Sequence, residues 1–69
     1  MKKYTYTSYE TYKWVTFEES WEVEAENKDE AIDFVENGVG KWIGRKLSAD
    51  NDNYYHHKTS EFKSIKRKK

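Results

Sequence analysis

Side chains of the types that hold metal ions occur at two places in this sequence. His56 and His57 are adjacent, and neighbours on a strand point to opposite faces, so they cannot grip one ion from one side. Carboxylates stand at the first, third and twelfth positions of a calcium-loop pattern: Asp50, Asp52 and Glu61. Tyr55, however, replaces the glycine that such a loop needs for its sharp turn. We therefore expect no bound metal.

Residue types that support catalysis are present without the patterns that use them. Residues 38–44 contain three glycines and a lysine, as phosphate-binding loops do, but they follow an expected helix rather than leading from a strand into one. None of the serines lies in a nucleophile motif, and a chain of 69 residues offers little room for a pocket that excludes water. We expect a binding protein, not an enzyme, and no cofactor.

Carboxylates recur at regular spacing in the middle of the chain. Glu22, Glu24 and Glu26 fall on one face of an expected strand, at a repeat of about 6.6 to 6.8 Å. More carboxylates follow on the expected helix: Asp29, Glu30, Asp33 and Glu36. The spacing is close to that of phosphates along a nucleic-acid strand, so this acidic face predicts a DNA decoy or an attraction to a basic groove. The alternative is a solvated face without a partner.

Two further groups of residues are candidates for partner contacts. Tyr12 and Trp14 face away from the expected core, beside the glutamates, and exposed aromatics often anchor interfaces, although here they could instead cover the second side of the sheet. The basic residues near the end of the sequence, including Lys66 and Arg67, suit phosphates or an acidic protein patch, or a solubilising end that frays over residues 66–69.

The charges are sorted along the chain, although the formal net charge is zero. Residues 18–36 hold nine carboxylates and one lysine, whereas residues 37–69 hold nine lysines and arginines and three carboxylates. There is no cysteine and no apolar run of the roughly 20 residues that a membrane span requires. We expect one folded domain over residues 1–69, in a reducing cytoplasm, with a core of the abundant aromatic residues.

Strand periodicity dominates the first part of the chain. Residues 11–17 and 21–26 alternate with a period of two, which predicts a hairpin that turns at 18–20. Its expected core face is apolar: Val15, Phe17, Trp21, Val23 and Ala25. Tyr4 and Tyr6 extend the first strand or form another one, with a bend at residues 8–10.

A helix is predicted over residues 28–37. Asn27 is a good N-cap, Glu30 completes a capping box, and Gly38 is a natural terminator. Beyond it, residues 39–47 predict either a second short helix or a loop, 48–53 a loop, and 54–65 one or two strands. The expected fold class is α+β, with an antiparallel sheet of three to four strands, one main helix on one face, and the order strand-strand-helix-strand.

Residues 12–17, followed by residues 21–32, resemble the small inhibitors of host RNA polymerase that short-tailed coliphages carry. The shared pattern is a hairpin that leads through Ala25-Glu26 to the helix start Asp29-Glu30-Ala31. The same pattern is similar to the DpnD/PcfM-like group of small phage and plasmid proteins. The resemblance implies the strand-strand-helix-strand fold given above.

The resemblance also implies a function. Proteins of that family clamp bacterial polymerase near its DNA channel, gripping it with arginines of the last strand and opposing DNA with acidic residues. Residues 62–68 would be that strand here, with Lys66 and Arg67 nearest the arginines. The chain departs from the family in its extra segment from Val39 to Lys58 and in having mostly lysines, which lack the planar fork of arginine.

We therefore expect a phage-type host-takeover protein that acts in the host cytoplasm as a monomer or dimer. It would inhibit a bacterial nucleic-acid-handling machine, RNA polymerase first. The predicted partner-binding residues are Tyr12, Trp14, Glu22, Glu24, Glu26, Asp29, Glu30, Lys66 and Arg67. The alternatives are a small nucleic-acid-binding protein that uses the basic C-terminal half, and an anti-defence inhibitor that blocks a nuclease.

Overall fold

Two long strands and one helix make up the structure, a computed structural model that describes residues 1–68. Strand β1 (Lys2–Ala25) is followed by helix α1 (Lys28–Glu36) and strand β2 (Lys41–Arg67). The strands pair antiparallel from Tyr4 opposite Arg67 to Glu22 opposite Lys41, so the last residues of β2 lie beside the first of β1. The expected sheet of three to four strands is wrong, and the order is strand-helix-strand.

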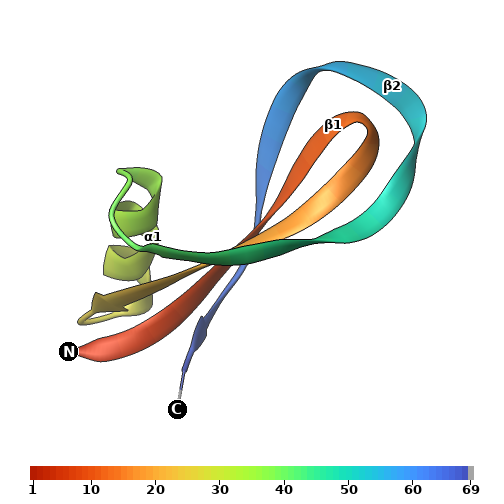
Figure 1. The fold of residues 1–69 in the computed structure, drawn as a ribbon. Coiled ribbons are helices and arrows are strands. Elements are labelled where there is room, and N and C mark those ends of the chain that lie inside the picture. Colours follow the sequence, from red (N-terminus) through yellow and green to blue (C-terminus); the bar gives the residue numbers. More distant parts are fainter. Residues whose placement is uncertain (69) are drawn as a thin grey trace.

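Strand β1 curves back on itself as a loop, and β2 follows the same path outside it (Figure 1). The bend lies at Lys13, whose φ of 55° is in the left-handed region. Side-chain contacts join the two halves of β1, because the hydroxyls of Thr11 and Thr16 lie 3.2 Å apart and those of Thr7 and Ser20 lie 3.4 Å apart. The predicted hairpin turn at residues 18–20 is therefore wrong.

Residues 18–20 continue the strand because β2 satisfies their polar groups. Glu18, Glu19 and Ser20 lie opposite Lys46, Arg45 and Gly44. Five register shifts interrupt the ladder, the first between Thr7 and Ser8. Irregularities of this kind bend a strand and increase its twist, which lets a long ribbon fold back without a tight turn.

The segment expected to hold a second helix or a loop and then another loop, residues 39–53, mostly belongs to β2, so those expectations are also wrong. β1 advances from Thr11 to Val15 at the bend, while β2 advances over the longer stretch from Thr59 to Asp50. The outer strand needs more residues because its path is longer. Turn-forming residues at 48–53 serve this outer curve, whereas the strand prediction for 54–65 is confirmed.

Helix α1 confirms the capping prediction. The backbone N–H of Glu30 donates to the Asn27 side chain over 2.8 Å. At the other end, Gly38 has a φ of 84°, its N–H donates to the Val35 carbonyl, and the Val39 N–H donates to the Phe34 carbonyl. These two bonds form a Schellman motif, which ends the helix and turns the chain toward β2.

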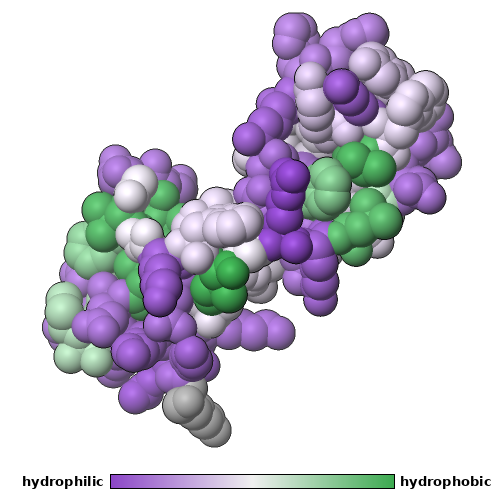
Figure 2. Space-filling model, viewed as in Figure 1, coloured by the Kyte–Doolittle hydropathy of each residue, from purple (hydrophilic) through white to green (hydrophobic). Residues whose placement is uncertain are grey.

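The core lies where α1 covers one end of the ribbon. Its buried residues are Tyr4, Val23, Ala25 and Ala31, and Phe34, Val35 and Ile65 pack against them. Val15, Phe17 and Trp21, which were expected in the core, are only half-buried. Apolar residues also gather at the far, bent end, which stands apart from the helical end (Figure 2).

The molecule is long for its size. Its principal extents are 41 × 22 × 15 Å and its radius of gyration is 13.0 Å, whereas a compact domain of this length would have about 11 Å. The two ends of the ribbon are therefore separate surfaces. No helix within residues 1–68 has the length and apolar character to cross a membrane.

Candidate partner-binding surfaces

Antiparallel pairing lays the acidic segment of the chain against the basic one. Four ion pairs join β1 to the C-terminal half of the chain. Three reach β2, namely Glu10–Lys58 at 3.1 Å, Glu18–Lys63 at 2.9 Å and Glu19–Arg45 at 3.9 Å, and Glu22–Lys68 at 2.7 Å reaches the residue that follows β2. Each joins residues far apart in the sequence. Glu18, Glu19 and Glu22 of the acidic segment are therefore neutralised by the basic half of the chain, whereas its other carboxylates form no ion pair within residues 1–68.

The predicted strip of three glutamates is only partly present. Glu22 is half-buried and accepts a hydrogen bond from Lys68, and this bond is the main reason why the pKa of Glu22 lies below its usual range. Glu24 is exposed on β1, whereas Glu26 lies just beyond Ala25, where the strand ends. Glu24 and Glu26 form no ion pair within residues 1–68.

Helix α1 divides its carboxylates between two roles. Glu30 is half-buried, and its side chain accepts from the backbone N–H of Glu26 over 3.1 Å, so it stabilises the helix start. Asp29, Asp33 and Glu36 are exposed and lie on one helix face, since they are four and three residues apart. Five carboxylates at this end of the molecule are exposed and form no ion pair within residues 1–68. We call them the acidic end: Glu24, Glu26, Asp29, Asp33 and Glu36.

Tyr12 and Trp14 flank the bend at Lys13, with 40% and 56% of their surface exposed. The Trp14 ring meets Tyr54 edge-on at 5.3 Å, and the Lys13 ammonium lies 5.2 Å from the centre of the Tyr12 ring. The bend and α1 occupy opposite ends of the molecule (Figure 1). The two aromatics therefore do not lie beside the glutamates, as was expected, but form a second surface, the aromatic bend.

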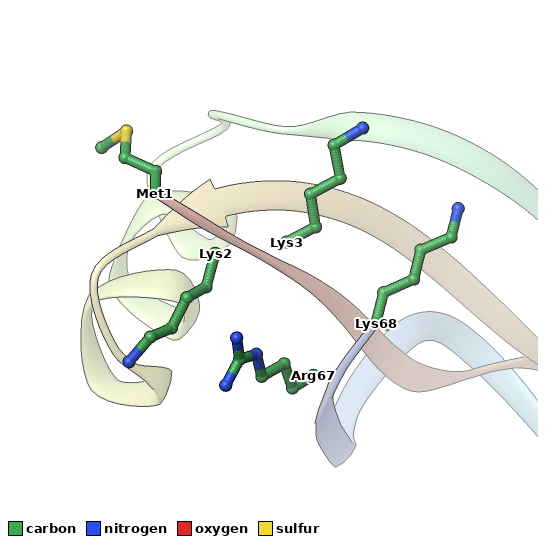
Figure 3. Close-up of a pocket in the computed structure, with 5 residues that line it drawn as sticks. All are labelled: Met1, Lys2, Lys3, Arg67 and Lys68. Atoms are coloured by element: carbon green, nitrogen blue, oxygen red, sulfur yellow. The ribbon is translucent and has the colours of Figure 1, made fainter.

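Lys66 and Arg67 lie within β2, opposite Thr5 and Tyr4. The next residue is also held, since the Lys68 N–H donates to the Lys3 carbonyl over 2.8 Å, while Lys69 lies outside the described residues. A hollow of about 750 Å³ lies here, lined by Met1, Lys2, Lys3, Arg67 and Lys68. Lys2 and Arg67 extend to one side of it and Lys3 and Lys68 to the other (Figure 3), so the cations do not converge on one anion.

Sequence reasoning missed a pair of carboxyl groups inside the ribbon. Glu10 and Glu19 are 6% and 9% exposed and come from the two halves of β1. Burial first, and then a hydrogen bond with Glu10, raise the pKa of Glu19 above its usual range, although Lys58 and Arg45 act in the opposite direction. No local sequence pattern predicts such a pair, because the two residues come together only when β1 folds back.

Comparisons of the chain with protein-family models, with curated proteins and with solved structures return no match. No group of three metal-ligating side chains is found within residues 1–68. Function is therefore inferred from the exposed side chains and their contacts.

Proposed function

We propose that this chain is a phage-type host-takeover protein that binds and inhibits a bacterial nucleic-acid-handling machine, RNA polymerase first. The acidic end would contact a basic, DNA-binding groove of the partner. One observation carries the proposal: the carboxylates of the acidic end are exposed and form no ion pair within residues 1–68, whereas four other glutamates of β1 are paired with basic residues of the C-terminal half.

The same ion pairs make direct binding of nucleic acid the weaker alternative. Four of the eight described basic residues of the C-terminal half, Arg45, Lys58, Lys63 and Lys68, each contact a glutamate of β1. Binding DNA or RNA with these residues would require breaking those pairs. A basic protein groove, in contrast, can attract the acidic end without rearrangement.

Tyr12 and Trp14 are proposed as a second contact with the same partner. A multisubunit polymerase extends much farther than the 41 Å length of this chain, so one partner can contact both ends. Exposed aromatic side chains contribute most of the affinity in many interfaces, while surface charge mainly sets the association rate and specificity. An anti-defence inhibitor of a nuclease would use the same acidic end.

The test is transcription by purified bacterial RNA polymerase with added protein. Wild type is expected to inhibit, and Glu24→Lys/Glu26→Lys is expected to lose at least tenfold in potency. Asp50→Lys/Asp52→Lys makes the same charge change at exposed positions of β2 near the bend, away from the acidic end, and should lose less potency. Equal potency of the two variants would contradict the role of the acidic end.

A pull-down from bacterial lysate extends the test beyond polymerase. Wild-type bait should recover a nucleic-acid-handling protein that the Glu24→Lys/Glu26→Lys bait does not recover. Trp14→Ala should weaken recovery, with Trp42→Ala as the control because Trp42 is equally exposed but lies elsewhere on the ribbon. Steeply salt-dependent binding of wild type to bare DNA would instead support the alternative function.

A further inference from the structure

A second hollow, of about 590 Å³, lies where the end of α1 approaches both strands. Three aromatic side chains line it: Tyr6 and Trp21 from β1 and Phe62 from β2. The Tyr6 ring meets Trp21 at 70° with centroids 5.9 Å apart, and meets Phe62 at 54° with centroids 5.2 Å apart. Because the rings meet at steep angles, they form walls of different orientation around the hollow rather than a parallel stack.

The charges around this aromatic hollow are all of one sign. Glu36 of α1 and Glu61 of β2 line it, and neither forms an ion pair within the part of the chain that the structure describes. None of the described residues that line it is a lysine or an arginine. The hollow therefore has a negative potential without an internal counter-ion.

The helix end adds to this potential. Val35, Glu36 and Gly38 place the C-terminus of α1 at the hollow, and the last turn of the helix carries no basic residue. The carbonyl end of a helix has a partial negative charge that favours a cation. A positively charged group would thus interact with the aromatic rings, the two carboxylates and the helix end together.

Tyr6 offers an unused polar group at the same place. Its side chain is 8% exposed and lines the hollow, and its hydroxyl makes no hydrogen bond within residues 1–68. Burial, and then the charge of Glu36, raise the pKa of Tyr6 above its usual range, so the phenol keeps its proton. The phenol can therefore accept a hydrogen bond from a bound N–H donor.

We propose that the aromatic hollow binds an organic cation, namely the guanidinium of an arginine or the ammonium of a lysine presented by a partner protein. Aromatic rings combined with carboxylates are the surroundings that such cations prefer, since the ring faces attract positive charge without competing for hydrogen bonds. The site shares Glu36 with the acidic end, but small ligands test it without any partner protein, so its failure and that of the proposed inhibition of polymerase can be told apart.

The test uses small ligands in an NMR titration of the full chain. N-acetyl-arginine amide is compared with N-acetyl-citrulline amide, which has nearly the same shape without the charge. We expect shifts at the Trp21 indole and at the amides of Gly38 and Phe62, with at least fivefold tighter binding of the arginine compound. Equal affinities, or shifts confined to other residues, would overturn the proposal.

Variants separate the aromatic and ionic contributions. Phe62→Leu keeps an apolar side chain at a position that is 47% exposed, and it should weaken arginine binding about threefold, as expected for one exposed cation–π contact. Tyr55→Leu is the control at an exposed aromatic outside the hollow. Glu36→Gln/Glu61→Gln should weaken binding further, whereas Glu24→Gln should not, and an unchanged affinity in the double variant would refute the site.

A third ligand distinguishes a protein side chain with N–H donors from a quaternary ammonium compound without them. Tetramethylammonium carries the charge without N–H donors for Tyr6 and the carboxylates. We expect it to bind more weakly than N-acetyl-arginine amide. Tighter binding of tetramethylammonium would overturn the assignment to a protein side chain.

Discussion

Glu10 and Glu19 come from the two halves of β1 and both are buried, and burial together with the neighbouring Glu10 carboxyl raises the pKa of Glu19. Because the pKa of Glu19 is raised, the folded protein holds the carboxyl proton of Glu19 more tightly than the unfolded chain does. The stabilisation is fully present below the ordinary glutamate pKa of about 4.3 and is lost as pH rises through the raised pKa. Urea unfolding of wild type should show this decline.

Glu19→Gln tests the same pair. The amide donates a hydrogen bond to Glu10 at every pH, so the variant should not lose this contribution above the ordinary glutamate pKa. Glu18→Gln is the control. The hydrogen bond from Lys63 lowers the pKa of Glu18, so the contribution of Glu18 to stability is lost as pH falls and not as it rises. Parallel curves for wild type and Glu19→Gln would contradict the shared proton.

Lys13→Gly should stabilise the bend. A lysine at a φ of 55° has a backbone strain that glycine does not have, and removing it should raise the free energy of unfolding by about 0.5–1 kcal/mol after glycine's own entropic cost. Lys46→Gly, at an exposed strand position of ordinary φ, should lower it by about the same amount. Chemical denaturation measures both, and a loss of stability in Lys13→Gly would show that the bend lies elsewhere.

The caps of α1 should each matter. Asn27→Ala removes the acceptor for the Glu30 N–H and should cost about 1 kcal/mol. Gly38→Ala places a Cβ at a φ of 84° and should cost about 1–2 kcal/mol. Asp33→Ala, at an exposed helix position, should change stability by less than about 0.5 kcal/mol. Thermal unfolding followed by circular dichroism checks the three, and equal melting temperatures would exclude the capping roles.

A charge exchange tests how the ribbon folds back. Glu18→Lys and Lys63→Glu should each lower the melting temperature, and the double variant should recover most of the loss because the pair is restored in reverse. The differences should shrink in 1 M salt, where exposed charges are screened. Glu24→Lys combined with Lys63→Glu is the control and should show no recovery, since these residues form no ion pair.

Helix α1 was predictable because its determinants are local: Asn27, Glu30 and Gly38 lie next to the residues that they cap. The bend was not predictable, because Lys13 carries no turn-forming side chain and its conformation is imposed by the ladder on either side. Residues 48–53 have the composition of a loop, yet they form part of the outer strand.

The candidate surfaces show the same division between local and distant determinants. Tyr12 and Trp14 are exposed, but so is Lys13 between them, so their exposure follows the bend and not the alternation of a strand. Their distance from the acidic end likewise depended on where β1 bends. Glu22 has no partner near it in the sequence, whereas in the structure it pairs with Lys68, just beyond the end of β2. The aromatic hollow combines Tyr6, Trp21 and Phe62 from three separate stretches, and no spacing rule connects them.

Because Tyr4 pairs with Arg67, synthesis on the ribosome leaves the first residues of β1 without their partner until nearly all of the described chain has been made. Only α1, with its local caps, can form early. Ladders between such distant residues close slowly, typically in milliseconds to seconds. Throughout that interval the backbone of β1 is an open template for other nascent strands, so yield in the cell should depend on translation speed and on chaperones that shield β1.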